Sequence, residues 1–438
     1  MRRWIVRGIL AVLVLAGSVP LNSFGEEKDV VELSVLYSGA DVTWVAAMEE
    51  LSRKFMLENP DVVIYTENSD KGSCEDELKV KEALDEFPDI FELGNVDVFA
   101  KAGRLGALNE ELSSLVTSPF TVGDTTYGLP MYAVTNGIIY NKEIFKKYDL
   151  NVPASYSEFL QVCEVLKQNG VVPLALGGNQ EENLTYWLNY FFQKDVIADI
   201  PNWLELRKKG EVSFTDAKPQ RMLEEYQQLV TSGYILEDSV DMSENQIVMK
   251  MVENEFAMIY AGPWMFSKII EAYPLAIESD KTRLEEEIAQ EDDPVTYRIG
   301  CFFVGDDNGE TTALTQNSAY WAVSKECMAD EKKGAVAEKF LRFFYKKENY
   351  RMMIQDIYGL PVTSEGIIYP APLVQQRLLI DYRYAKKSQE YLKSFGVQED
   401  FRSMLNEILH ALYDGVYTPS EAALQMDLIW NQGMNGEK

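Results

Sequence analysis

The residues best placed for chemistry in this chain of 438 residues are aromatic rings beside turn-forming residues. Tyr132 and Trp264 each follow a Gly/Pro turn, and Tyr358 precedes another. For any one of these rings a place in a hydrophobic core is the alternative, but a ring on a loop between two sheets is better suited to contact a ligand. Sugars carry apolar C–H faces and a rim of hydroxyl groups, so they suit a site that combines flat rings with carboxylates and amides.

The sequence offers no recognisable catalytic or metal-binding motif. It has no G-x-S-x-G elbow, no Walker loop and no G-x-G-x-x-G after a predicted strand. His410 is the sole histidine, which excludes mechanisms that need two. Residues 306–309 resemble the start of a calcium loop but lack its ligand spacing, so we expect a hairpin turn there. We therefore predict no catalytic residue, metal or cofactor, although a glycosidase-like carboxylate pair would be indistinguishable among 70 acidic residues.

Charge and the first residues indicate an exported protein. The net charge of −29 repels phosphate backbones, which argues against binding to nucleic acid. Three arginines precede an apolar run over residues 9–19, which is too short to span a bilayer comfortably, and small residues permit cleavage after Gly25. We predict a signal peptide over residues 1–25, with an uncleaved anchor as the alternative. Ser18 stands where a bacterial lipobox has its lipidated cysteine, so we expect no lipid anchor at that position.

The first hundred residues predict alternating strands and helices. Strands are expected over 31–37, 62–65 and 90–93, and helices over 44–55 and 75–86. This βαβαβ order implies a parallel, doubly wound sheet, which binds ligands beyond the carboxyl ends of its strands. The loops at those ends carry Asp41, Asn68, Asp70 and Asn95.

Later segments give clearer helix signals. Capping boxes are predicted at Ser155 with Glu158 and at Thr418 with Glu421, and a further helix is expected over 335–345. The acidic residues over 278–294 predict a solvated surface helix and loop. An exported chain has room for one or two disulfides among Cys74, Cys163, Cys301 and Cys327, although the apolar helix stripe around Cys163 favours a buried free thiol there.

Six segments, read in order, resemble the carbohydrate-binding family of extracellular solute-binding proteins of ABC importers, which includes maltose-binding protein. The resemblance extends over about residues 30–430, and its motifs lie at 87–90, 102–108, 127–130, 139–145, 153–159 and 256–264.

This resemblance implies an α/β fold of two lobes joined by a hinge that the chain crosses three times. The first lobe is expected to comprise 26–132 with 311–352, and the second 133–310 with 353–438. A mono- or oligosaccharide would bind between the lobes and pass to membrane permease subunits, without chemistry, and we expect a monomer at the outer face of the cytoplasmic membrane, in a periplasmic or extracellular setting. The alternatives are a binder of a non-sugar solute, a chemosensory binder and a secreted glycoside hydrolase.

The resemblance also implies site residues. Those near the ends of the first three strands are Asp41, Trp44, Asn68, Asp70 and Asn95. Trp264 matches a ring that commonly stacks on sugars, and Tyr132 to Asn136 match the first hinge crossing. Asn317 and Tyr320 follow the next crossing, and Trp187 faces either the ligand or the second-lobe core. Two of the departures from the family bear on the site: Asn254 replaces a turn glycine, and Phe401-Arg402 lies where maltose-binding relatives carry a second stacking tryptophan, which disfavours maltodextrin. Because the candidate loops are acidic and poor in arginine, we expect a neutral or amino-bearing ligand, with peptides and polyols left open.

Overall fold

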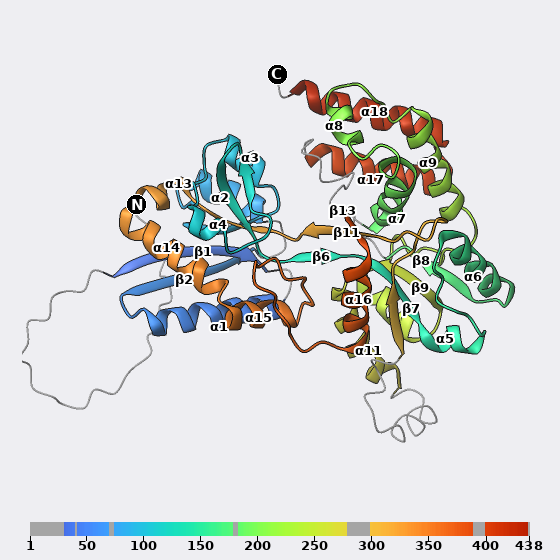
Figure 1. Ribbon diagram of the computed structural model, residues 1–438, viewed down its shortest axis with the longest axis horizontal. Helices are drawn as coiled ribbons and strands as arrows, with labels where there is room; N and C mark the ends of the chain where they lie inside the picture. The colour runs from blue at the N-terminus through green and yellow to red at the C-terminus, as the bar shows by residue number, and fades with distance from the viewer. Residues whose placement is uncertain are drawn as a thin grey trace, which may run out of the picture.

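The protein consists of two α/β lobes that lie side by side (Figure 1). The computed structural model describes residues 30–39, 42–69, 74–177, 183–277, 298–388 and 399–436. The predicted signal peptide, Asp41, Asp70 and the acidic stretch over 278–294 lie outside these residues. In the part of the chain that the structure describes, no helix is long and apolar enough to cross a membrane.

The first lobe is built on a six-stranded sheet in the order β2-β1-β3-β12-β5-β4. Strands β1, β2 and β3 are parallel, as the predicted βαβαβ order requires, whereas β12 runs antiparallel to β3 and β5. Its elements are β1 (Val31–Ser38), α1 (Val42–Glu58), β2 (Val62–Ser69), α2 (Cys74–Ala83), β3 (Ile90–Leu93), α3 (Val96–Lys101), α4 (Glu110–Ser113), β4 (Phe120–Val122), β5 (Thr125–Pro130), β12 (Tyr320–Val323), α13 (Lys325–Ala329), α14 (Glu331–Phe344) and α15 (Lys347–Gln355).

Alternation along β1 explains how this sheet is buried on both faces. Leu33, Val35 and Tyr37 pack into the larger core, whereas Leu36 packs into a smaller cluster on the other side. The predicted stripe of α1, with Phe55 at its end, is buried in the larger core together with α14 and α15.

The second lobe has a four-stranded sheet in the order β10-β7-β9-β8, with a core on each face. In β7, Ile138 enters the larger core and Ile139 the core on the opposite face. Its elements are β7 (Gly137–Asn141), α5 (Lys142–Lys147), α6 (Tyr156–Gln168), β8 (Val172–Ala175), α7 (Asn183–Phe191), the π-helix η1 (Phe192–Ile197), α8 (Trp203–Lys208), α9 (Ala217–Val230), α10 (Glu244–Val252), β9 (Phe256–Ala261), α11 (Trp264–Ile277), β10 (Ile299–Phe302), α16 (Leu373–Tyr384), α17 (Glu399–Tyr413) and α18 (Pro419–Gly436).

A small third sheet, β13-β11-β6, lies between the lobes (Figure 1). It comprises β6 (Ala133–Thr135), β11 (Thr312–Asn317) and β13 (Lys386–Ser388). Strands β6 and β11 carry the first two crossings of the hinge and pair antiparallel, and the Thr135 hydroxyl donates to the Leu314 carbonyl at 2.8 Å. Tyr382 of α16 packs against cores of both lobes, and its hydroxyl accepts from the Thr315 hydroxyl at 3.1 Å.

The third crossing comes later in the chain than we expected. We placed the change of lobe at residue 353, but that residue lies within α15, and Leu360, Val362 and Tyr369 are buried in the first-lobe core. The chain joins the second lobe only with α16, whose Val374 and Leu378 are buried there. Sequence reasoning missed this because the segment after α15 has no helix or strand pattern of its own.

Several local predictions can be judged directly. The Thr418–Glu421 capping box is confirmed in both directions, at 2.8 and 3.3 Å. Ser155 caps α6 as predicted, but the Glu158 carboxylate accepts from the Ala154 amide at 2.7 Å and not from Ser155. Asn254 takes a positive φ of 63°, so the turn survives without glycine. All four cysteines are buried free thiols, which excludes the disulfides that the sequence left open.

The hairpin turn predicted over residues 306–309 is also confirmed. Gly305 bridges Thr311, and the Gly309 amide donates to the Asp306 carbonyl at 3.0 Å. The Asp306 carboxylate accepts backbone N–H groups from Asn308 and Glu310, so it closes the turn.

Candidate ligand-binding site

Sheet register gathers the first-lobe candidates at one edge. Tyr320 pairs with Leu93 of β3 on one side and with Pro130 of β5 on the other. Asn95 and Tyr132 each lie two residues beyond those partners, so both are close to Tyr320. Asn317 pairs with Ala133 at the start of the hinge. These residues, far apart in the sequence, therefore surround the junction between the first lobe and the hinge.

Asn317 and Tyr320 form a polar pair. The Asn317 amide Nδ2 donates to the Tyr320 hydroxyl at 2.9 Å, and both side chains are half-buried. Burial raises the pKa of Tyr320, so its hydroxyl stays protonated and can itself donate. The pair can thus offer a hydroxyl donor and an amide oxygen to a polar ligand.

Trp44 and Tyr132 contact each other with ring centroids 5.6 Å apart. Trp44 is only 5% exposed and also packs edge-on against Phe344, so it belongs to the first-lobe core. Tyr132 is half-buried and packs against Gly359, where an added Cβ would lie 3.0 Å from its Cδ2. Of the two predicted rings, Tyr132 is the more exposed, and Trp44 packs against it from the first-lobe core.

The two remaining described candidates of the first lobe, Asn68 and Asn95, are exposed. Asn95 precedes α3 without forming a side-chain cap, so its amide is not used by the helix. Its backbone N–H and that of Gly94 donate to the Glu75 carboxylate at 3.2 and 2.6 Å. Glu75 thus fixes the loop that presents Asn95.

Glu92 is a feature of this edge that sequence reasoning missed. Its carboxylate accepts from the Ser38 backbone N–H at 2.9 Å, at the end of β1. Burial, with a smaller contribution from the negative charge of Glu75, raises the pKa of Glu92 to about 7, against the opposing effect of the Ser38 hydrogen bond. The available signal was a glutamate inside the apolar strand of residues 90–93.

Asn136 is the most informative candidate of the hinge. It is 8% exposed, and its Oδ1 is buried without a hydrogen-bond partner among the described residues. Because Gly137 pairs antiparallel with Ala261, Asn136 lies across from Gly262 and close to Trp264. Buried polar atoms in folded proteins are rarely left without a partner, so this oxygen is suited to accept from a ligand or a water.

Trp264 begins α11 and is half-buried, packed against the core beneath β9. Its indole Nε1 donates to the Glu244 carboxylate at 3.2 Å. Sequence reasoning missed Glu244, whose only signal was its place directly after the cap of α10.

Trp187 lies in the second-lobe core, the second of its two predicted positions. It is 1% exposed and is surrounded by the rings of Phe159, Tyr190, Phe191 and Tyr260, with centroids 5.1 to 6.2 Å away. A ring enclosed in this way has no face left for a ligand, so Trp187 has no place among the contacts proposed below.

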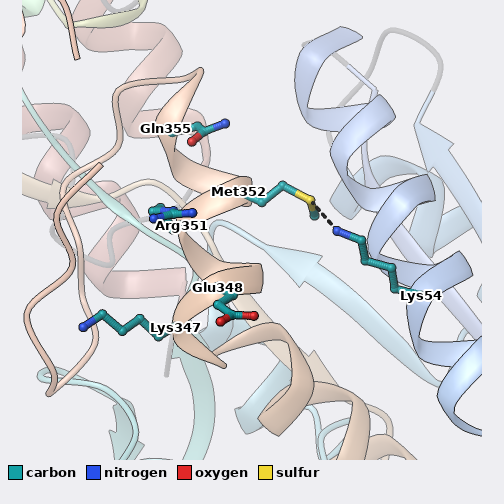
Figure 2. Close-up of a pocket in the computed structure, with 6 residues that line it drawn as sticks. All are labelled: Lys54, Lys347, Glu348, Arg351, Met352 and Gln355. Atoms are coloured by element: carbon teal, nitrogen blue, oxygen red, sulfur yellow. Dashed lines mark hydrogen bonds between the residues drawn. The ribbon is translucent and has the colours of Figure 1, made fainter. Parts of the chain in front are cut away.

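Two surface pockets lie apart from these residues. One, of about 510 Å³, lies between α1 and α15, where Figure 2 shows the Lys54 amine reaching the Met352 sulfur at 3.4 Å. The other, of about 330 Å³, lies on the second lobe beside Arg207 and Asp427. No group of three or more histidine, cysteine or acidic side chains suited to a metal ion occurs within the ranges that the structure describes.

Comparison with known proteins finds one matching family and relatives that are named as sugar-binding proteins. A family model described as "Bacterial extracellular solute-binding protein" matches residues 39–351, which is more than half of the chain. The multiple sugar-binding protein of Streptococcus mutans serotype c is 23% identical over 377 residues, covering 82% of this chain and 81% of that protein. The melibiose/raffinose/stachyose-binding protein MelE of Bacillus subtilis is 20% identical over 212 residues, covering 46% of this chain and 49% of that protein.

Solved structures share the fold. A chitin oligosaccharide binding protein superposes with a TM-score of 0.77 at 21% identity, covering 93% of this chain and 100% of that one. RafE in complex with raffinose superposes with a TM-score of 0.71 at 16% identity, covering 92% and 100%. These likenesses confirm the predicted two-lobed α/β fold.

Proposed function

The chain belongs to the family of bacterial extracellular solute-binding proteins, and we propose that it captures a carbohydrate between its two lobes for an ABC importer. The relatives named as binding sugars support a mono- or oligosaccharide as the ligand. The family as a whole binds and delivers solutes, which supports a role without turnover.

One observation carries this proposal: the Oδ1 of Asn136, buried and without a partner in the described part of the chain, lies across the strand pair from the turn that presents Trp264. A sugar suits both groups at once, because its hydroxyls donate to the Asn136 amide oxygen and its C–H face stacks on the Trp264 indole. Tyr132 and the Asn317–Tyr320 pair on the first lobe complete a site that closing of the lobes would bring together. Asn68 and Asn95 are proposed rim contacts from the same lobe.

The chemistry of these groups supports a neutral or amine-bearing ligand. Glu75 places a carboxylate at the first-lobe edge, and Glu244 places another beside Trp264. Such surroundings disfavour a uronate or a phosphorylated sugar, since those groups would face like charge.

We further propose that the protein is exported and works as a monomer at the outer face of the cytoplasmic membrane. Cleavage after Gly25 would release it, because Ser18 cannot form the thioether of a lipoprotein. Closure over the ligand would present both lobes to the permease subunits.

Thermal unfolding of the mature chain against a sugar panel tests the function. The panel comprises raffinose, stachyose, melibiose and chitin oligosaccharides, with amino acids, peptides and polyols as comparison classes. A ligand at about a thousand times its dissociation constant should stabilise the native state by about 4 kcal/mol. We expect a shift with one sugar class that Trp264→Ala abolishes. A shift with a comparison class alone would overturn the carbohydrate assignment, and steady product formation would overturn the binding role.

The chemosensory alternative has a separate test. A binder of that kind would take the same sugar and show the same shift, but its deletion would leave uptake of the labelled sugar intact. Loss of uptake on deletion supports delivery to an importer.

A further inference from the structure

The indole of Trp264 is held from two directions by groups of its own lobe. On one side lies Gly262, where an added Cβ would fall 1.8 Å from Cζ3, 2.3 Å from Cε3 and 2.4 Å from Cη2 of the indole. The six-membered ring of the indole therefore lies directly against the glycine backbone, a position that no other residue type would permit.

The opposite, five-membered end of the indole is held by Glu244. Its Oε2 accepts from the Trp264 Nε1 at 3.2 Å, while its Oε1 forms an ion pair with Lys268. Lys268 follows Trp264 by four residues, so both project from the same face of α11. The Glu244 side chain is 15% exposed, which places this hydrogen bond largely out of water, where it is stronger.

Glu244 is itself rigidly placed. It is the first residue of α10, directly after Ser243, which forms a complete capping box with Gln246. A carboxylate in the first helical turn is also stabilised by the partial positive charge of the helix end. The backbone that carries Glu244 is therefore fixed before any ligand arrives.

From these contacts we propose that Glu244 is a positioning residue that fixes the indole of Trp264 in the orientation that stacks on the sugar. This inference rests on the proposed function, because it concerns the ring that the ligand would contact. With Gly262 against one end of the indole and Glu244 bonded to the other, rotation of the ring about its side-chain bonds is blocked. The ligand then meets a preformed platform and does not have to order it on binding.

A set of substitutions tests this through Trp264 itself. We expect Glu244→Ala to weaken binding of the panel sugar that stabilises the wild-type chain, raffinose being the first probe, by about tenfold. Glu244→Gln retains an acceptor for the indole N–H and should stay within about threefold of wild type. Lys268→Met is the matched control, since it breaks the ion pair but leaves the indole hydrogen bond, and it should also stay within about threefold.

Repeating Glu244→Ala in the Trp264→Phe background tests whether Glu244 acts through the indole N–H, because phenylalanine has no N–H group. There the substitution should have no further effect on affinity. The indole Nε1–H resonance of Trp264 should shift and lose its protection from exchange in Glu244→Ala, but not in Lys268→Met.

The results of these experiments distinguish the positioning role of Glu244 from the proposed sugar-binding function. An unchanged affinity in Glu244→Ala, or an equal loss in the Trp264→Phe background, would overturn the positioning role, even if the resonance moves. Failure of the wild-type chain to bind any sugar of the panel would instead contradict the proposed function.

Discussion

Replacing Asn136 by leucine should make the protein more stable and its ligand affinity weaker. The Oδ1 of Asn136 is buried and has no hydrogen-bond partner among the residues that the structure describes, and a buried unsatisfied polar group costs about 1–3 kcal/mol. Leucine has a similar size and no polar atom, so the free energy of unfolding should rise by about 1 kcal/mol. The same substitution removes an acceptor for the sugar and should raise the dissociation constant by about 5- to 100-fold.

The assay pairs urea unfolding, followed by circular dichroism, with isothermal titration against the sugar that the panel identifies. Asn202→Leu is the matched control, because Asn202 is exposed and forms no side-chain cap. It should leave both quantities unchanged. If Asn136→Leu binds sugar as tightly as wild type, the amide oxygen is not a ligand contact. If it lowers stability, the Asn136 oxygen has a hydrogen-bond partner in solution and is not an unsatisfied acceptor.

Three further predictions concern charge and packing. Because the pKa of Glu92 is raised to about 7 in the folded state, the free energy of unfolding should fall as pH rises from about 4.5 to 7. Urea unfolding at a series of pH values should show a smaller fall for Glu92→Gln. Asp427→Ala should destabilise the second lobe by about 3–5 kcal/mol in urea unfolding, since it leaves the buried Arg207 without its carboxylate. Gly262→Ala should displace the Trp264 indole and weaken sugar binding by tenfold or more in titration calorimetry, because the new Cβ would overlap the ring.

Each of these three predictions has a result that would contradict it. An unchanged slope in Glu92→Gln would mean that the carboxylate titrates in its ordinary range. A stability of Asp427→Ala equal to that of the exposed control Asp414→Ala would mean that the network around Arg207 contributes little. Normal affinity in Gly262→Ala would show that the indole position does not matter for binding.

Hydrophobic periodicity was sufficient to predict most of the local structure. The alternation of Leu33, Val35 and Tyr37, and the helical stripe that ends at Phe55, follow from burial of one face or stripe, and the structure shows both. Asn254 at positive φ was predictable because asparagine tolerates that backbone better than most residues.

The candidate site was harder to predict, because ligand contact depends on long-range packing. Trp44 and Trp187 are tryptophans beside polar segments, yet both are enclosed by rings from distant elements. Little in the sequence indicated that Glu244 and Glu92 matter, because their hydrogen-bond partners, Trp264 and Ser38, lie 20 or more residues away in the chain. The late third crossing escaped prediction because the segment after α15 has no helix or strand pattern of its own, although Leu360 and Val362 are buried in the first-lobe core.

Hydrogen–deuterium exchange with and without the bound sugar would locate the ligand on the chain and so test whether it is captured between the two lobes. We expect protection on both sides of the hinge at once, over residues 93–95, 130–137 and 317–320, and over 262–266. Protection confined to one lobe, or to the surface pocket between α1 and α15, would contradict capture between the lobes.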